Sequence, residues 1–143
     1  MADDAVRVAR TGIHPLHAFL LAASVPLFLG ALLSDITYSR SYQIQWSNFA
    51  AWLLPAALVF AGFALLWALI DLLRADRHWS GRPLLYFLVL LAAWIIGFID
   101  ALVHAEDAWG KMPQALILSL IATVLACAAA WLGFSMWRAG DVK

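Results

Sequence analysis

Three ionisable residues of this sequence, Asp35, Asp100 and His104, have the types and spacing of a small polar site. Asp100 and His104 are four residues apart, so they would lie on one side of a helix. Carboxylates and an imidazole can hold a proton, a cation or a small polar ligand, and we interpret the three as a pocket of this kind. The alternative interpretation is that Asp100 only pairs with His104 one turn further along the helix.

A second group, His14, His17 and Asp71, has the residue types of a metal site. His14 and His17 are three residues apart and lie on one side of a predicted helix, from which His17 could reach Asp71. Two imidazoles and a carboxylate can bind Zn²⁺ or another divalent metal, since His and Asp are ordinary ligands. The alternative is a pair of histidines satisfied at a membrane interface, without a ligand.

The histidines also raise the question of haem b, which needs one or two axial histidines at a single depth. A bis-histidine haem within one chain is poorly supported, whereas ligation by His104 alone, or by His104 from two chains, stays open. The sequence contains no nucleophile beside a base, no glycine-rich phosphate loop and no zinc-protease helix. These observations favour a protein that is not an enzyme.

The elements that would position these residues are membrane-spanning helices. Hydrophobic residues make up 65% of the 143 residues and charged residues 13%, against about 45–50% and about 25% in soluble domains. The nine basic residues balance nine acidic ones, so no net field attracts nucleic acid. A single cysteine, Cys127, excludes an internal disulfide framework and a multi-thiolate metal site. The composition is that of a bilayer protein.

Four stretches are long and apolar enough to cross the hydrocarbon core, which takes about 20 residues of helix. Prolines near the starts of three of them, Pro15, Pro83 and Pro113, suit the first turn, where the amide groups lack partners anyway. We therefore predict a single all-α transmembrane domain over residues 1–143, an integral membrane four-helix bundle. Its helices are predicted at about residues 14–35, 49–72, 83–104 and 113–137.

The basic residues predict the orientation of the bundle. If both termini and the middle connection face the cytoplasm, that side has seven basic residues and the other side has two, Arg40 and Lys111. The positive-inside rule therefore predicts that both termini lie inside. The group of His14 then forms an inner layer and the group of Asp35 an outer layer. His14 and Asp35 are 21 residues apart on one helix, about 31 Å along its axis, so the layers cannot form one site.

Small residues on the predicted fourth helix indicate how the helices pack, because lipid provides no hydrophobic force between helices. Alanines recur every four residues at Ala122, Ala126 and Ala130, and a strip that contains Ser119 adjoins them. We interpret both strips as contacts within one bundle. The alternative is a homodimer that forms through this helix.

Two segments resemble a bacterial membrane protein family, domain of unknown function 2231. The first has the motif His-Pro-Leu-His at residues 14–17 and Ser-Asp-Ile-Thr-Tyr at 34–38, and the second runs from Trp46 to Asp71. The resemblance covers about half the chain. It implies about four helices in a bacterial inner membrane and no settled biochemical activity. Some relatives are joined to c-type cytochrome domains, which implies a link to periplasmic electron transfer.

The chain departs from the family pattern at two places. Typical members have a second proline shortly after the first motif, where this chain has Ala18, and often a histidine early in the third span, where residues 85–87 are Leu, Tyr and Phe. A haem or metal site that rests on that histidine does not carry over. The resemblance implies that a shared ligand site involves the matching polar positions, which are His14, His17, Asp35 and Asp71.

Three functions are consistent with these observations. The first is a non-catalytic anchor or accessory subunit, in a bacterial inner membrane, that binds a partner protein. The second is a redox module that binds haem b or a divalent metal and works with a periplasmic redox partner. The third is a proton- or ion-conducting bundle, formed as a dimer because four helices enclose little pathway.

Overall fold

Four helices make up the described part of the chain, in a computed structural model that describes residues 13–74, 81–106 and 111–140. They are α1 (Pro15–Ser41), α2 (Ile44–Arg74), α3 (Arg82–Ala105) and α4 (Gln114–Gly140). Each contains a stretch long and apolar enough to cross a membrane. The prediction of an all-α membrane bundle with four spans is confirmed.

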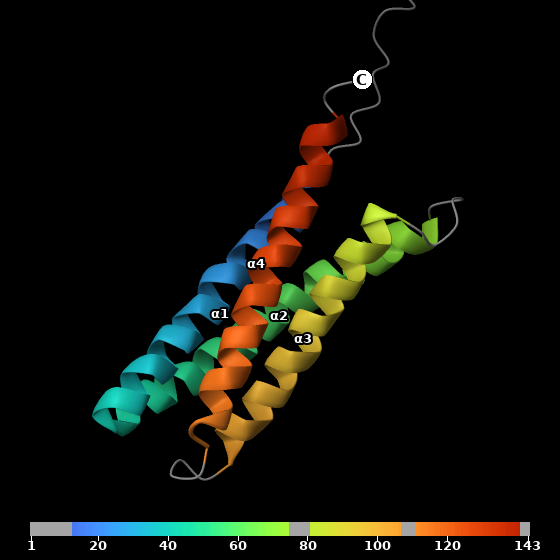
Figure 1. The fold of residues 1–143 in the computed structure, drawn as a ribbon. Helices are drawn as coiled ribbons and strands as arrows, with labels where there is room; N and C mark the ends of the chain where they lie inside the picture. Colours follow the sequence, from blue (N-terminus) through green and yellow to red (C-terminus); the bar gives the residue numbers. More distant parts are fainter. Residues whose placement is uncertain (1–12, 75–80, 107–110, 141–143) are drawn as a thin grey trace, which may run out of the picture.

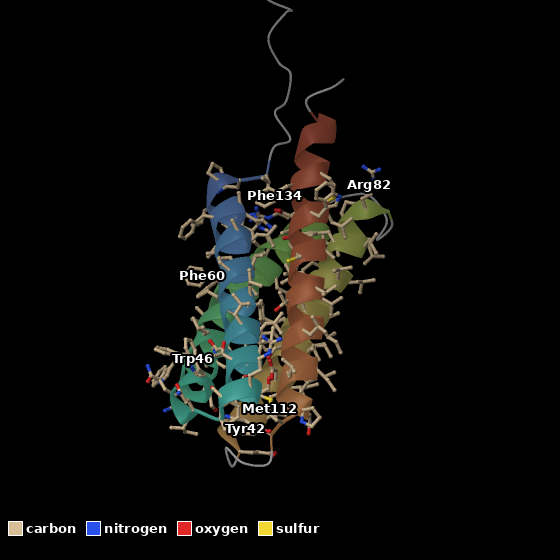
Figure 2. All side chains as sticks on the ribbon, turned by 60° about the vertical axis from the view of Figure 1, so that its left-hand side comes forward. Tyr42, Trp46, Phe60, Arg82, Met112 and Phe134 are labelled. Carbon is tan, nitrogen blue, oxygen red and sulfur yellow. The ribbon has the colours of Figure 1, made fainter. Side chains whose placement is uncertain are left out.

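The helices form a closed antiparallel ring in which each packs against the next, and α4 packs back against α1 (Figure 1). The start of α1 and the end of α4 lie at one end of the bundle, which we name the terminal end. The opposite end, with the connections from α1 to α2 and from α3 to α4, is the distal end. Figure 2 shows Tyr42 and Met112 at the distal end and Phe134 toward the terminal end.

α1 and α2 extend beyond their predicted bounds at the distal end. α1 continues six residues past residue 35 to Ser41, and α2 begins at Ile44 instead of about 49. The polar residues of this extension are helical, and the hydroxyls of Thr37 and Ser41 donate to carbonyls one turn earlier, each at 2.8 Å. Tyr42 ends α1 with a left-handed φ of 53° and donates its N–H to the Tyr38 carbonyl. Only two residues therefore separate α1 from α2.

Small residues let the helices approach closely, as expected where lipid provides no hydrophobic force between them. On α4, Ala122 and Ala126 are buried in the bundle, while Cys127 is exposed on its surface. Gly97 of α3 lies so close to the ring of Phe28 from α1 that a Cβ there would be 2.6 Å from a ring carbon. These contacts are those of packing inside one bundle, and the homodimer through α4 stays a prediction.

Large apolar side chains cover the outer surface of all four helices. Trp52 and Trp131 are 79% and 72% exposed, and Phe19, Phe63 and Leu102 are each more than half exposed. Water would solvate such a surface poorly, whereas the hydrocarbon of a bilayer suits it. The helices therefore contact the lipid bilayer directly.

Candidate metal site

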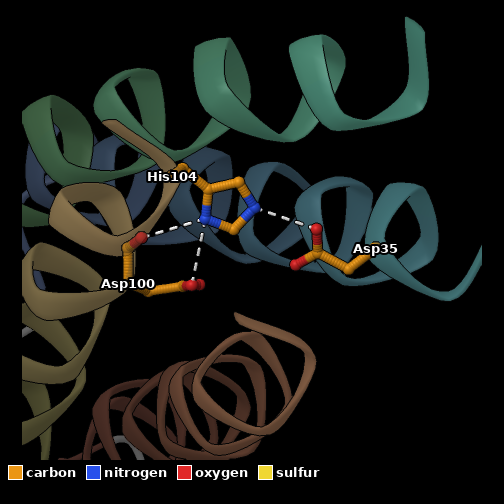
Figure 3. Close-up of side chains that lie close together, drawn as sticks. All are labelled: Asp35, Asp100 and His104. Carbon is orange, nitrogen blue, oxygen red and sulfur yellow. Dashed lines mark hydrogen bonds and ion pairs between the residues drawn. The ribbon is translucent and has the colours of Figure 1, made fainter. Parts of the chain in front are cut away.

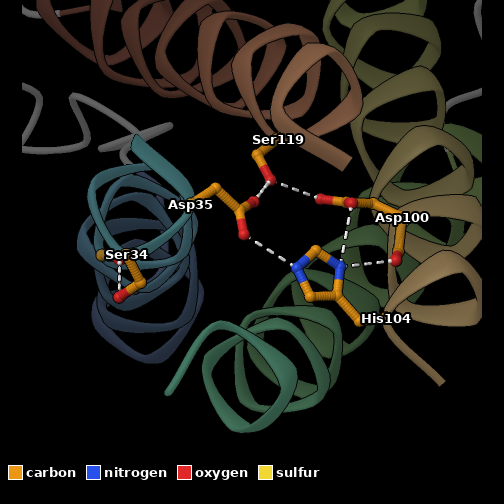
Figure 4. Close-up of polar contacts among 6 residues, drawn as sticks. Ser34, Asp35, Asp100, His104 and Ser119 are labelled. Carbon is orange, nitrogen blue, oxygen red and sulfur yellow. Dashed lines mark hydrogen bonds and ion pairs between the residues drawn. The ribbon is translucent and has the colours of Figure 1, made fainter. Parts of the chain in front are cut away.

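Residues from three helices meet inside the bundle near the distal end: Asp35 from α1, Asp100 and His104 from α3, and Ser119 from α4 (Figures 3 and 4). Asp35 lies six residues before the end of α1, Asp100 five before the end of α3, and Ser119 five after the start of α4. All three helix ends are distal, so similar distances from them correspond to similar depths in the bundle. Side chains far apart in the sequence therefore reach one another.

His104 is held through both of its ring nitrogens. Nδ1 lies 2.9 Å from the backbone carbonyl of Asp100 and 3.2 Å from Oδ1 of the same residue. Because a carbonyl only accepts, Nδ1 carries the hydrogen and donates it. Nε2 lies 2.9 Å from Oδ1 of Asp35, so the imidazole joins α3 to α1 (Figure 3).

Ser119 closes the cluster from the opposite side. Its hydroxyl contacts Oδ2 of Asp35 and lies 2.8 Å from Oδ2 of Asp100 (Figure 4). A hydroxyl has one hydrogen and two lone pairs, so it can donate to one of these carboxyl groups and accept from the other. Ser119 therefore bridges the two aspartates of α1 and α3 from α4.

The cluster is shielded from its surroundings on every side. Both aspartates are completely buried, and His104 is 6% exposed. Oδ1 of Asp100 is buried and accepts no hydrogen bond, although it lies 3.2 Å from Nδ1 of His104. A buried acceptor without a hydrogen bond costs about 1–3 kcal/mol, so this oxygen is available to a further partner.

The donor atoms are close enough together to hold one cation. Asp35, Asp100 and His104 each offer one ligand atom, and these atoms all lie within 4.8 Å of one another. Carboxylate oxygen and imidazole nitrogen are ligands of Zn²⁺, Fe²⁺ and Mn²⁺ in proteins. Two ionised carboxylates also match the charge of a divalent ion, which matters where water cannot compensate it.

A positive charge lies at the same end of the bundle, just outside the membrane-spanning helices. Lys111, in the connection before α4, is only 4% exposed, and its Nζ lies 5.9 Å from the centre of the Tyr38 ring. Burial lowers the pKa of Lys111, and the charges of Asp35 and Asp100 oppose this shift. The two carboxylates therefore also act electrostatically on this ammonium group.

The second predicted group is arranged differently. His14 precedes α1 as its N-cap, where its Nδ1 accepts the N–H of Leu16 at 3.2 Å, and its ring stacks on Trp67 at 4.8 Å. His17 is buried, with Nε2 2.7 Å from the hydroxyl of Tyr86. Its Nδ1 is buried and has no hydrogen-bond partner.

Asp71, the third member of that group, is exposed on α2. Within the described ranges, the ligand atoms of Asp35, Asp100 and His104 lie within 4.8 Å of one another, and those of His14, His17 and Asp71 do not. The metal site predicted from these residues therefore stays a prediction, and no described contact gathers its ligand atoms.

The structure brings together all three residues of the predicted outer pocket and adds one that sequence reasoning missed. The sequence pattern indicates only a packing residue at Ser119, because a serine among alanines is typical of close helix contacts. The signal that could have found it is depth, since it lies as far from the distal end as Asp100 does. Lys111 was counted only as a loop charge, and nothing in its sequence position indicated burial.

Comparison with protein families agrees with this architecture. A family model described as "Predicted membrane protein (DUF2231)" matches residues 13–142, most of the chain. No curated protein and no solved structure matches the sequence or the fold. The family match extends through α3 and α4, beyond the two segments that resembled the family in sequence. The chain therefore belongs to the membrane protein family of domain of unknown function 2231.

Proposed function

We propose that the protein binds a divalent metal ion within the membrane, with Asp35, Asp100 and His104 as ligands. The observation that carries the proposal is the approach of their ligand atoms to within 4.8 Å of one another in a buried site. Side chains of two helices supply these atoms, and Ser119 of a third helix lies against both carboxyl groups. A bound ion would therefore tie α1, α3 and α4 together.

The orientation of His104 supports this role. Metal-binding histidines usually donate their second ring nitrogen to a carbonyl or carboxylate, which fixes the ring and the tautomer. Here Nδ1 donates to the Asp100 carbonyl, so that Nε2 faces Asp35. Oδ1 of Asp100 accepts no hydrogen bond and lies 3.2 Å from Nδ1 of His104, so the Asp100 side chain would turn one carboxylate oxygen toward an ion bound at Nε2.

The ligand set also favours one class of metal. Mg²⁺ and Ca²⁺ prefer oxygen ligands alone, whereas an imidazole nitrogen suits first-row transition metals and zinc. Two carboxylates with one imidazole therefore favour Mn²⁺, Fe²⁺, Co²⁺ or Zn²⁺. With Fe²⁺ or Mn²⁺ the site would be compatible with the redox role, and a periplasmic redox partner remains part of that proposal.

The other two functions have less support from the geometry. Ion conduction needs a polar path from the distal to the terminal end, but the described core between them contains the buried apolar residues Leu21, Phe28, Leu54 and Leu90. Ser24, buried in the same region, donates to the Leu21 carbonyl of its own helix. An anchoring role is compatible with a metal site, and no particular contact favours it.

The orientation and the location are further parts of this proposal. The excess of basic residues at the terminal end supports a cytoplasmic position for both termini in a bacterial inner membrane. The metal site near the distal end would then face the periplasm. A reporter enzyme that works only in the cytoplasm should be active when fused after Lys143, and an inactive fusion would contradict this orientation.

Metal analysis of the purified protein tests the central proposal. Protein in detergent is stripped with a chelator, dialysed against Mn²⁺, Co²⁺ or Zn²⁺, and analysed for metal by mass spectrometry. We expect one ion per chain, and visible absorption bands of Co²⁺ with an imidazole ligand.

The matched variants are Asp100→Asn at the site and His17→Asn at the terminal end. Asp100→Asn should lower the affinity by more than the roughly 10–100-fold loss typical of residues that only support a ligand. His17→Asn should keep the wild-type affinity. Equal binding by wild type and Asp100→Asn, or no binding by either, would reject the proposal.

A further inference from the structure

Lys111 is attached to the elements that build the site. Its carbonyl accepts the N–H of Ala115 at 2.8 Å in the first turn of α4, the helix that carries Ser119. Its Nζ lies over the ring of Tyr38, which is buried one turn after Asp35 on α1. The backbone of Lys111 is therefore bonded to α4, while its ammonium group lies against α1 one turn from Asp35.

Burial of this ammonium group needs compensation by negative charge. Moving an unpaired ammonium out of water is costly, and contact with an aromatic ring returns only part of that cost. Among the described residues, Asp35 and Asp100 are the ones whose charges favour the ionised form of Lys111. The same two carboxylates thus support the buried lysine.

We propose that Lys111 is a built-in competitor of the metal, so that binding of a divalent ion drives its ammonium group out to water. This inference rests on the proposed function. The two carboxylates can balance the charge of a divalent ion. Without the ion, part of their negative charge balances the positive charge of Lys111. A divalent ion and a buried Lys111 together would leave one positive charge uncompensated in a low-dielectric environment. Lys111 therefore sets the metal affinity of the site.

The chemistry of lysine suits this exchange. Its ammonium group ends a flexible four-carbon stem, so it can reach the interface while its backbone stays in place. Lys111 lies outside the spanning segment of α4, which begins at Gln114. The movement to water is therefore short and leaves the start of α4 intact.

Two measurements test the inference. In Lys111→Met, which keeps the length of the side chain without its charge, the dissociation constant for Mn²⁺ or Zn²⁺ should fall about tenfold, equivalent to roughly 1.4 kcal/mol. Lys111→Arg keeps the positive charge and should not show this gain. Thermal unfolding of both variants in detergent verifies that they are folded.

The second measurement uses the wild-type protein, so it does not depend on the folding of a variant. The chain has two lysines, Lys111 and Lys143, whose acetylation by acetic anhydride can be followed separately by mass spectrometry. Saturation with Zn²⁺ should increase the acetylation rate of Lys111 severalfold and leave that of Lys143 unchanged. In Asp100→Asn, Zn²⁺ should leave both rates unchanged.

The outcomes separate this inference from the proposed function. If wild type binds metal and Asp100→Asn does not, but Lys111→Met binds as wild type and the acetylation rate stays constant, Lys111 is not a competitor and the metal site stands. If no protein binds metal, both proposals fail. A gain in affinity together with faster acetylation supports the competition.

Discussion

The two ends of the bundle contain the same kinds of ionisable residue and use them differently. At the distal end, the polar atoms of Asp35, Asp100 and His104 are directed at one another inside the bundle. Among the described contacts, the imidazole of His104 neither caps a helix nor stacks on an aromatic ring. Oδ1 of Asp100 accepts no hydrogen bond. The result is a buried set of donor atoms around a common centre.

At the terminal end, the three residues make different contacts and do not converge on a common centre. His14 caps α1 and stacks on Trp67, His17 pairs with Tyr86, and Asp71 faces outward. The comparison teaches that residue type determines what a side chain can bind, while its neighbours determine which donor atoms remain available. A ligand site requires side chains that converge from several helices at one depth.

The largest expected effect is on stability at the distal end. Asp35→Ala leaves Nε2 of His104 without a partner and removes one of the two carboxyl groups that Ser119 contacts, and breaking a buried pair in this way typically costs about 3–5 kcal/mol. Asp71→Ala, at the exposed aspartate of the terminal end, should change the free energy of unfolding very little. Unfolding in mixed detergent micelles measures both, and equal losses would abolish the distinction between the ends.

A smaller effect is expected from a methyl group at two glycines of the bundle. In Gly97→Ala the new Cβ meets the stiff ring of Phe28 at 2.6 Å, so we expect a loss of about 1–3 kcal/mol. The same change should weaken metal binding, because Asp100 is one turn away on α3. Gly133→Ala meets the flexible end of Leu21 at 2.8 Å and the ring of Tyr86 only at 3.2 Å, so it should cost less. If Gly133→Ala lost more stability than Gly97→Ala, the packing around Gly97 would be more adaptable than the packing around Gly133.

The smallest effect is expected at the terminal end. Tyr86→Phe removes the hydrogen bond to Nε2 of His17, whose Nδ1 already lacks a partner, and should cost about 1 kcal/mol. Metal affinity should not change, because no described contact joins this pair to the distal cluster. A loss of metal from Tyr86→Phe would contradict the independence of the two ends.

Much of the fold follows from the sequence because long apolar stretches determine where helices cross a bilayer. The proximity of Asp100 and His104 follows as well, since both lie within one regular helix. The sequence predicts the end of the first helix at about residue 35, whereas α1 continues to Ser41 and so contains Asp35. The hydroxyls of Thr37 and Ser41 donate to carbonyls of their own helix, so these polar residues are compatible with it.

The parts that could not be predicted depend on how each helix is rotated about its axis. Ser119 and the packing alanines look alike in a sequence pattern, and only the rotation of α4 decides which of them faces the aspartates. His14 and His17 do lie on the same side, as their spacing predicts, because both rings contact Trp67 of α2. The cap conformation of His14, with φ −60° and ψ 136°, and the hydrogen bond that its Nδ1 accepts from the N–H of Leu16 could not be predicted from the spacing.

The two-residue turn between α1 and α2 has a consequence for biosynthesis. We expect helices joined so tightly to leave the ribosome and enter the lipid as one hairpin. Asp35 is then inserted 69 residues of translation ahead of its hydrogen-bond partner His104, and until that partner arrives its carboxyl group bears the cost of a polar group in the membrane. Arrival of the second hairpin relieves this cost, so the late helices secure the early ones in the membrane.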